Sequence, residues 1–410
     1  MNRCQSCFCE YGDEYGLCPE CGYVAGSQEN PVYRLPHGCI INNRYIIGKT
    51  IGSGGFGITY KAWDMKLETV VAVKEYYPLG LVNRVPGTKD VNLVSKKRVT
   101  EYNNGYTRFL DEARNMAKFN GHINIVNVFE FFEENGTAYI VMEFLEGQDL
   151  KAFVNNMGGR LDADTSIHII SEISKALETI HKKGIIHRDI SPDNIFVCLN
   201  NTIKLIDFGA ARFSESGDKN LTIILKPGFA PPEQYEKVNE QGPWTDIYAL
   251  GATMYMILTG CKPDESTNRK IKDELNSPNI IIPEIKENLS NAVMKAMAVD
   301  KHLRFNNMKE FREAIQGERN VISVAKEKKK RKRKRFLTIA VAACVITCAI
   351  GILAGKVEKQ KEEETLPEAT VDVWYIADSD TVDGAAKNMA MEAIVAEFMR
   401  SYNTRSHSNS

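Results

Sequence analysis

Strand-like and helix-like patterns of apolar positions alternate without a long break from residue 41 to residue 317. YIIGKTIGSGGFGITYKAWD, residues 45–64, predicts a strand, a glycine turn and a second strand, because β-branched and aromatic residues follow the glycines. TVVAVKEYY, residues 69–77, predicts a third strand, whereas RFLDEARNMAKF, residues 108–119, has the apolar spacing of a helix. The mixture indicates an α+β domain in this part of the chain.

A different pattern marks residues 336–355, where twenty uncharged and mostly apolar positions follow one another. At ~1.5 Å per residue, a helix of this length spans the ~30 Å hydrocarbon layer of a membrane. A buried core helix would show a polar face, and this run has none. Residues 326–335 include nine basic residues in ten, which by the positive-inside rule places 1–335 in the cytoplasm and 356–410 outside. A basic run can also be a nuclear signal or a nucleic-acid arm, but its place beside the apolar run favours attraction to anionic lipid.

The segment after the predicted span is short. Residues 371–377 alternate like a strand, and a helical pattern follows. The apolar positions of that helix are Met389, Ile394, Val395 and Phe398. One strand and one helix cannot bury a core, so this piece needs a partner or belongs to a longer chain. Gly351 and Gly355 form a single G-x-x-x-G, which permits a homodimer but also fits the ordinary glycine content of membrane helices.

Composition indicates the class of partner and the cellular compartment that suit this chain. The chain has 410 residues, 43% of them hydrophobic, and a net charge of −1, so no overall field favours a nucleic-acid partner. Five of its ten cysteines lie within the first 21 residues, which is unlike a disulfide framework and suits a reducing compartment with one metal site. The start of the chain, MNRCQSCFCE, has no apolar core and therefore forms no signal peptide.

Four of these cysteines form two C-x-x-C pairs, Cys4 with Cys7 and Cys18 with Cys21. Each pair makes a tight turn that directs two thiolates to one point, and four thiolates satisfy tetrahedral Zn²⁺. Residues 1–23 therefore look like a zinc ribbon with a structural role, since so small a segment cannot fold alone. Cys9 is a fifth thiol that could replace Cys7. Nucleic-acid or redox binding by this segment lacks supporting basic and aromatic residues.

A glycine-rich loop follows. Gly52, Gly54 and Gly57 make G-x-G-x-x-G, whose backbone amides can approach phosphate oxygens closely. A dinucleotide-binding turn has the same spacing but opens a helix, whereas a strand follows here, so the loop is a β-hairpin lid. The residues expected to contact the nucleotide are Ile51, Gly52, Ser53, Gly54, Gly55, Phe56, Gly57, Ile58 and Thr59.

Lys74 lies toward the end of the third predicted strand in the setting V-A-V-K, which suits a cation with a buried stem that binds the α- and β-phosphates. A single strand lysine can also be a solvated edge residue, but this apolar setting argues against that. In the helix that follows, Glu112 lies beside the apolar side and can pair with Lys74. Asp111, about 100° round the helix, is the competing acid.

These motifs resemble those of the protein kinase family, and the resemblance covers residues 45 to about 315. It implies that TAYIVMEFLEG holds adenine, with Met142 as gatekeeper and backbone groups of Glu143 and Leu145 facing the base. The order of several such motifs, together with the leading cysteine segment, looks like that of bacterial Ser/Thr kinases with one membrane span.

The resemblance also implies which residues carry the reaction. In HRDISPDN, Asp189 would accept the proton of the substrate hydroxyl and Asn194 would hold the second Mg²⁺. In KLIDFGAAR, Asp207 would be the principal Mg²⁺ ligand. Pro192 is typical of the Ser/Thr type of catalytic loop.

Three further residues look like supports of such a site. Glu233 in FAPPEQY resembles the residue that ends the activation segment, and Arg304 in KHLRF resembles its arginine partner. Asp246 in WTDIYALG resembles the residue at the start of a helix that anchors the catalytic loop.

Two positions depart from the family pattern. Ser191 stands where the catalytic loop usually has a lysine that holds the transferred phosphate, and Lys226, seven residues before Glu233, stands where threonine is typical. We expect that the hydroxyl and the ammonium have changed places, so that Lys226 reaches the γ-phosphate and Ser191 supplies a hydroxyl to Asp189, because lysine stems are long and flexible. The alternative is a solvated loop lysine and a serine without a role.

Thr222 lies eleven residues before Glu233, where many kinases take an activating phosphate, and Arg188 could bind that phosphate. Ser214 and Ser216 are rival positions, and each of these hydroxyls can equally be a solvated loop group.

The sequence thus predicts a two-lobed α+β protein kinase fold, preceded by a small zinc ribbon and followed by one transmembrane helix. The predicted function is ATP-dependent phosphorylation of Ser/Thr in proteins, with autophosphorylation. The predicted location is the cell membrane, with a single span and a cytoplasmic kinase domain. The alternative is a nucleotide-binding pseudokinase scaffold, but the presence of all the residues needed for transfer argues against it. The expected cofactors are ATP, Mg²⁺ and structural Zn²⁺, and the expected partners are protein substrates and the cytoplasmic membrane, without nucleic acid. The expected boundaries are zinc ribbon 1–23, linker 24–44, kinase domain 45–317, basic juxtamembrane segment 318–335, transmembrane helix 336–355 and extracytoplasmic tail 356–410.

Overall fold

The computed structural model divides the chain into two compact units, Met1–Arg335 and Phe336–Ser410, which are described separately. It describes residues 2–12, 16–24, 33–208, 225–235, 240–331, 333, 389–398 and 400. In the second unit, residues 389–398 are helical. The predicted span 336–355 lies outside the described residues, and among those described no helix is long and apolar enough to cross a membrane.

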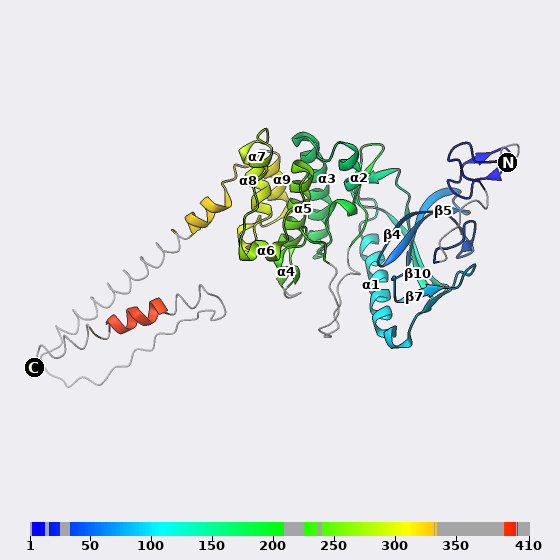
Figure 1. Ribbon diagram of the computed structural model, residues 1–410, viewed down its shortest axis with the longest axis horizontal. Coiled ribbons are helices and arrows are strands. Elements are labelled where there is room, and N and C mark those ends of the chain that lie inside the picture. The colour runs from blue at the N-terminus through cyan, green and yellow to red at the C-terminus, as the bar shows by residue number, and fades with distance from the viewer. Residues whose placement is uncertain are drawn as a thin grey trace, which may run out of the picture. The chain divides into compact units, whose positions relative to one another are not determined.

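A six-stranded antiparallel sheet in the order β3-β4-β5-β6-β10-β9 builds the small lobe of the first unit (Figure 1). Its strands are β3 (Ile40–Ile41), β4 (Tyr45–Gly54), β5 (Gly57–Asp64), β6 (Thr69–Tyr76), β9 (Val128–Glu134) and β10 (Thr137–Glu143). Buried and half-buried residues alternate along β5, as a strand with one face on the core requires. The helix α1 (Val99–Ala117) packs on β9 and β10 with Phe109, Ala113 and Met116 buried. A short hairpin of β7 (Val82–Arg84) and β8 (Val91–Leu93) lies between β6 and α1 in the chain.

Part of the predicted linker packs into this lobe. Leu35 is fully buried, and its backbone N–H donates to the hydroxyl of Tyr60 at 3.0 Å. The Tyr60 and Tyr139 hydroxyls in turn donate to Glu75, each at 3.0 Å, and the buried Arg84 pairs with the same carboxylate. Because these contacts join residues far apart in sequence, the Pro- and Gly-rich composition of 24–44 does not reveal that its second half is anchored.

Helices build the large lobe. They are α2 (Leu150–Asn156), α3 (Ala163–Lys182), α4 (Pro232–Tyr235), α5 (Pro243–Thr259), α6 (Ser266–Ile271), α7 (Pro278–Ile281), α8 (Glu287–Ala296) and α9 (Met308–Ile315). α5 is buried on nearly every side, and α3, α8 and α9 pack against it. The α5 helix ends at Gly260, whose φ of 73° is the left-handed conformation that favours glycine as a helix cap.

A three-stranded antiparallel sheet positions the loops that carry chemistry. It consists of β11 (Gly147–Asp149), β12 (Ile195–Cys198) and β13 (Ile203–Leu205). Ile195 pairs with Leu205, so the residues just before β12 and just after β13 leave the sheet at the same end. The backbone N–H of Ile206 donates to the carbonyl of Asn194 at 3.1 Å, which holds the two loops together.

The amino-terminal segment is a two-stranded sheet, β1 (Asn2–Arg3) and β2 (Glu10–Tyr11), with cysteine-containing turns. It rests on the small lobe. The Phe8 ring centre lies 6.3 Å from that of Trp63 on β5, and the Arg3 guanidinium lies 3.9 Å from the Trp63 ring centre.

The described part of the predicted juxtamembrane segment is attached to α8. Asn288 Oδ1 accepts a hydrogen bond from the Val321 backbone N–H at 2.7 Å, and Asn291 Nδ2 donates to the Val321 carbonyl at 3.0 Å. One turn further along α8, Lys295 pairs with Glu327 at 2.7 Å. Three positions on one face of α8 therefore fix the chain as it leaves the large lobe.

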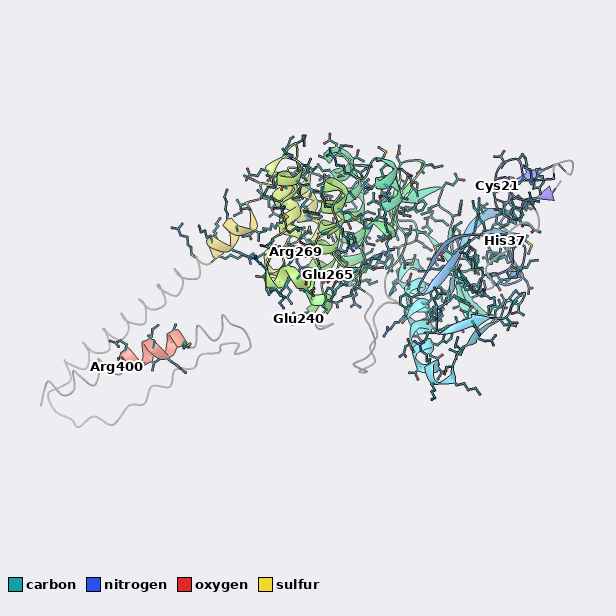
Figure 2. All side chains as sticks on the ribbon, in the orientation of Figure 1. Cys21, His37, Glu240, Glu265, Arg269 and Arg400 are labelled. Atoms are coloured by element: carbon teal, nitrogen blue, oxygen red, sulfur yellow. The ribbon has the colours of Figure 1, made fainter. Side chains whose placement is uncertain are left out.

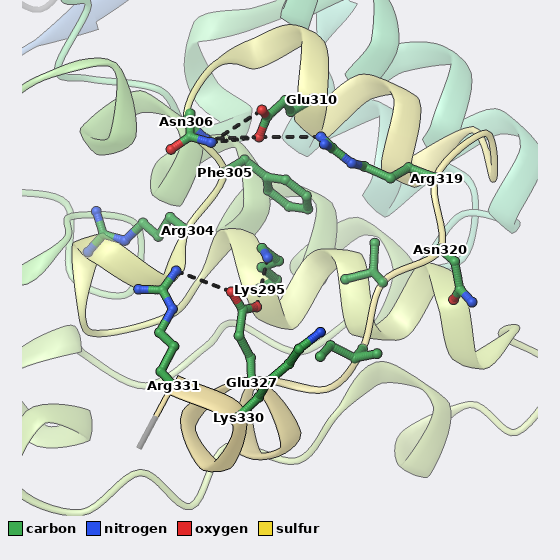
Figure 3. Close-up of a pocket in the computed structure, with 12 residues that line it drawn as sticks. Lys295, Arg304, Phe305, Asn306, Glu310, Arg319, Asn320, Glu327, Lys330 and Arg331 are labelled. Atoms are coloured by element: carbon green, nitrogen blue, oxygen red, sulfur yellow. Dashed lines mark hydrogen bonds and ion pairs between the residues drawn. The ribbon is translucent and has the colours of Figure 1, made fainter. Parts of the chain in front are cut away.

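A cavity of about 380 Å³ lies beside this attachment (Figure 3). Its lining includes Lys295, Arg304, Glu327 and Arg331, and Glu327 accepts from both Lys295 and Arg331. The lining contains no residue of the glycine loop or the catalytic loop, so the cavity is separate from the predicted nucleotide site.

Candidate active site

The catalytic loop holds Asp189 and Asn194 against each other. Asn194 Nδ2 donates to Asp189 Oδ2 at 2.6 Å and to the Asp189 carbonyl at 2.7 Å. With its amide nitrogen committed to Asp189, Asn194 can offer a metal ion only its amide oxygen. Both residues are buried, so the Asp189 carboxylate has a fixed direction.

Asp246, at the start of α5, holds the backbone of this catalytic loop in place through hydrogen bonds. Its carboxylate accepts hydrogen bonds from the backbone N–H groups of His187 at 2.9 Å and Arg188 at 2.8 Å, and lies 2.7 Å from His181 Nε2. Burial raises the pKa of Asp246, but the hydrogen bonds from His181 and from the backbone outweigh it and lower the pKa below its usual value. Arg188 has a φ of 70°, and the Asp246 carboxylate holds this unusual backbone in place.

Lys74, near the end of β6, links two acidic groups. Its Nζ lies 2.9 Å from Glu112 Oε1 on α1 and 3.0 Å from Asp207 Oδ2 after β13. Burial lowers the pKa of Lys74, but the charges of Asp207 and Glu112 outweigh it and raise the pKa, so the side chain is an ammonium. The competing acid, Asp111, instead pairs with Arg114 on the helix surface at 2.8 Å.

The glycine loop is a hairpin, as the residue pattern predicts. Gly54 pairs with Gly57 across the turn, and no helix follows, because β5 begins at Gly57. A β-carbon at Gly57 would stand 2.5 Å from the Glu75 carbonyl oxygen, so only glycine fits this position. Residues 51–55 are exposed, so a phosphate can approach this part of the hairpin.

The segment predicted to hold adenine, residues 137–147, consists of β10 and the residues that follow it. Met142 is buried, and the Glu143 backbone N–H donates to the Asn127 carbonyl at 3.0 Å, so Glu143 can offer a base only its carbonyl. The Glu143 side chain turns elsewhere and pairs with Lys204 at 2.7 Å. The sequence motif around Glu143 does not predict its ion pair with Lys204, because the two residues are 61 positions apart.

Ser191 and Lys226 lie together. Lys226 Nζ donates to Ser191 Oγ at 2.5 Å and lies 3.7 Å from Asp189 Oδ1. Asp193, which the motif alone did not single out, is a further carboxylate 3.6 Å from Lys226. Thr222, Ser214 and Ser216 lie outside the described residues.

Glu233, on α4, makes a buried ion pair with Arg304. The guanidinium donates to the two carboxylate oxygens at 2.6 and 3.1 Å, and neither side chain is more than 4% exposed. The same carboxylate accepts from the Thr245 hydroxyl at 3.1 Å. This pair connects the end of the segment that carries Lys226 to the base of the large lobe.

The four cysteines of the C-x-x-C pairs converge. The sulfur atoms of Cys4, Cys7, Cys18 and Cys21 all lie within 4.8 Å of one another. Cys4 and Cys21 are 3.6 Å apart, as are Cys7 and Cys18, close to the ~3.8 Å separation of thiolates at ~2.3 Å from one tetrahedral zinc ion. These residues therefore fit such a metal.

Cys9 also belongs to this cluster, with its sulfur 3.1 Å from Cys18 and 3.3 Å from Cys7. Cys21 is the exposed member and lies near the amino-terminal end of the first unit (Figure 2). The cluster thus has five thiols for four tetrahedral positions.

Residues 45–316 match the family model described as protein kinase domain. The chain is 30% identical over 291 residues to a probable serine/threonine-protein kinase of Clostridium acetobutylicum, covering 69% of this chain and 41% of that protein. It is 34% identical over 282 residues to the probable serine/threonine-protein kinase PknB of Lactococcus lactis subsp. lactis, covering 67% and 42%. The solved structure of PpkA-294 in its apo form is 36% identical with a TM-score of 0.62, covering 69% of this chain and 99% of that one.

The chain therefore belongs to the protein kinase domain family, and the predicted two-lobed fold is confirmed. It spans about two fifths of the length of the curated relatives that it matches.

Proposed function

We propose that the chain is a serine/threonine protein kinase that transfers the γ-phosphoryl group of ATP to hydroxyl groups of proteins, its own included. The observation that carries this proposal is the chain of ion pairs from Glu112 through Lys74 to Asp207, next to the Asp189–Asn194 pair. A nucleotide-binding scaffold needs only the first three of these groups. A buried carboxylate held ready to accept a proton is a requirement of the transfer itself.

Each residue has a role that its geometry permits. The substrate hydroxyl gives its proton to Asp189 while its oxygen bonds to the γ-phosphorus, and ADP leaves with the electron pair of the broken bond. Lys74, directed by Glu112, binds the α- and β-phosphates. Asp207 and the amide oxygen of Asn194 are the hard oxygen ligands that would hold Mg²⁺, which when bound neutralises phosphate charge.

The decisive experiment uses the purified full chain with labelled ATP, Mg²⁺ and a general protein substrate, beside Asp189→Asn. We expect label on serine or threonine with the natural chain and none with the variant. Nucleotide binding without transfer by the natural chain would make it a scaffold, and label on tyrosine would contradict the proposed substrate class.

The proposal includes a structural Zn²⁺ in the amino-terminal segment. Its support is the distance fit of the four thiols Cys4, Cys7, Cys18 and Cys21, and the small size of a segment that has little core of its own.

It also includes a single membrane span at residues 336–355, with the kinase domain in the cytoplasm. The support is the apolar run and the nine basic residues in 326–335. Protease treatment of intact cells tests it: only the segment after 355 should be cleaved. Gly351 and Gly355 support a homodimer through this span, which crosslinking of the intact membrane protein can test.

Regulation by phosphate at Thr222 completes the proposal. The motif spacing to Glu233 supports it, as does Arg188 as a cation beside the catalytic Asp189. Mass spectrometry after incubation with ATP should find phosphate on Thr222. An active enzyme with unmodified Thr222 would refute this part.

A further inference from the structure

Lys226 brings a cation to the catalytic carboxylate from outside the catalytic loop. Its Nζ lies 3.7 Å from Asp189 Oδ1, 3.6 Å from Asp193 Oδ2 and 2.5 Å from Ser191 Oγ. Ser191 is fully buried, and the Lys226 side chain is 19% exposed. A solvated loop lysine would instead point its ammonium into water, where hydration favours it.

The backbone around Lys226 is fixed. The Lys226 carbonyl accepts hydrogen bonds from the backbone N–H groups of Phe229 and Ala230, both at 3.1 Å, and the Ala230 carbonyl accepts from the Ser266 hydroxyl at 2.7 Å. Gly228 has a φ of 84°, and a β-carbon there would stand 2.6 Å from the Pro263 carbonyl oxygen. The turn that aims Lys226 therefore requires glycine and is tied to the start of α6.

The segment is also tied to the catalytic loop. Gln234 Nε2 donates to the Arg188 carbonyl at 2.7 Å, and Glu233 is held by Arg304. The position of Lys226 is thus fixed by contacts of its segment with the start of α6 and with the catalytic loop, and not by its attraction to Asp189 alone.

A cation beside Asp189 favours transfer, in addition to any Mg²⁺ held by Asp207 and Asn194. Lys74 is committed to Glu112 and Asp207, whereas the hydroxyl that receives the phosphoryl group has to lie within hydrogen-bond reach of Asp189, which brings the phosphoryl group close to that carboxylate. A phosphoryl group brought beside a carboxylate is repelled unless a positive charge lies between or beside them. Among the described residues, Lys226 has its ammonium within ion-pair distance of Asp189.

We propose that the Lys226 ammonium binds the transferred phosphoryl group and that the Ser191 hydroxyl positions that ammonium by accepting its hydrogen bond. This inference rests on the proposed kinase function and deepens it. The phosphorus–oxygen bond to ADP breaks as the bond to the substrate oxygen forms, the hydroxyl proton goes to Asp189, and Lys226 stays protonated throughout. The phosphate-binding cation then belongs to the segment that precedes Glu233, so transfer requires that segment to be ordered.

The test compares Lys226→Met and Lys226→Gln with Lys262→Met in the full chain. Lys262 is an exposed lysine whose side-chain carbons lie 3.1–3.3 Å from the β-carbon that Gly228 lacks, so its loss changes the net charge equally beside the same turn. We expect kcat to fall about 10²- to 10³-fold in both Lys226 variants, as when one preorganised donor is removed from a transition state. The Lys262 variant should stay within about twofold of the natural chain.

Nucleotide binding separates this role from a merely structural one. Both Lys226 variants should bind ADP as the natural chain does but lose its preference for a non-hydrolysable ATP analogue over ADP, with melting temperatures confirming the fold. Equal weakening of ADP and of the analogue, or a kcat that is unchanged or higher, would overturn the proposal. If the natural chain itself transfers no phosphate, the proposed function fails first, and the loss of analogue preference in the variants still decides whether Lys226 contacts the γ-phosphate.

Discussion

The ring of Phe8 lies against Gly48 so closely that a β-carbon at position 48 would stand 2.7 Å from the ring. Phe8 belongs to the turn between Cys7 and Cys9, and Gly48 belongs to β4, the strand that leads into the glycine loop. The contact of Phe8 with Gly48 thus adds to those of Phe8 and Arg3 with Trp63 in holding the cysteine segment on the small lobe. A change that increases the mobility of the cysteine segment should therefore also increase the mobility of β4.

We expect Gly48→Ala to displace the cysteine segment from the small lobe, because the added methyl group occupies the space of the Phe8 ring. Backbone amides of residues 2–11 should then exchange with solvent roughly tenfold faster or more, equivalent to about 1.4 kcal/mol of lost protection. Hydrogen exchange measured by mass spectrometry checks this. Gly16→Ala is the control, since nothing lies within 4 Å of a β-carbon there. Equal exchange in the two variants would show that the Phe8–Gly48 contact holds nothing.

The second prediction concerns the metal. Because four sulfur atoms already fit one tetrahedral ion, the purified chain should contain about one zinc ion, and Cys4→Ser should lose it. Cys9→Ser should keep its zinc, since Cys9 is the spare thiol. Elemental analysis of the three proteins measures the content. If Cys9→Ser loses zinc as Cys4→Ser does, then Cys9 is a ligand and one of the C-x-x-C cysteines is the spare.

The parts of the site that lie within short sequence motifs are predicted well from the sequence. The residues after the glycines predict the hairpin, and the phase of one helix predicts the pairing of Lys74 with Glu112, although the two are 38 residues apart. Asp189 and Asn194 are identified by the resemblance of their motif to the catalytic loop of protein kinases. Counting along the chain also predicts that Ser191 and Lys226 belong to one site, but the hydrogen bond from Lys226 to Ser191 is not part of that prediction, which directs the Ser191 hydroxyl to Asp189.

Contacts between distant residues are what the sequence conceals. The contact of Phe8 with Gly48 and the hydrogen bonds of Tyr60 and Tyr139 to Glu75 have no periodic signal, because each joins residues of different strands or segments, 15 and 64 positions apart in the case of the two tyrosines. The attachment of Val321 to α8 is hidden in the same way, since a basic segment before an apolar run suggests a tether and not a docked chain. Charge and composition report what a segment can contact, whereas its packing partner is fixed only by the fold.

The third prediction concerns the buried pair of Glu233 and Arg304. Removing one partner leaves an uncompensated buried charge, so Arg304→Met should cost about 3–5 kcal/mol of the free energy of unfolding. Arg319→Met, which breaks the more exposed pair with Glu310, should cost no more than about 1 kcal/mol. Urea denaturation of the two variants provides the comparison. Similar costs at both sites would mean that the Glu233 pair is no more important than a surface contact.

The fourth prediction is a pH dependence from His187. This side chain is fully buried with its ring centre 5.0 Å from that of Phe208, and burial lowers its pKa below the ordinary 6.5 although Asp246, Asp189 and Asp207 act in the opposite direction. Between the folded pKa and 6.5 the unfolded chain binds the proton and the folded chain does not. Stability from His187 is therefore complete above about pH 6.5 and declines as the pH falls through that window, by at most about 1.4 kcal/mol per pH unit.

His187→Phe keeps a ring against Phe208 and removes the titrating group, while His302→Phe removes an exposed histidine instead. We expect the free energy of unfolding of the His302 variant to decline between pH 7 and pH 5 with the slope of the natural chain, and that of the His187 variant to decline less steeply. The Asp189 backbone N–H donates to His187 Nδ1 at 3.3 Å, so the His187 variant should be less stable than the natural chain at pH 7. Only the difference in slope is diagnostic, because a lost hydrogen bond shifts the whole curve whereas a lost titration changes its shape. Parallel curves for all three proteins would show that another group is responsible for the acid sensitivity.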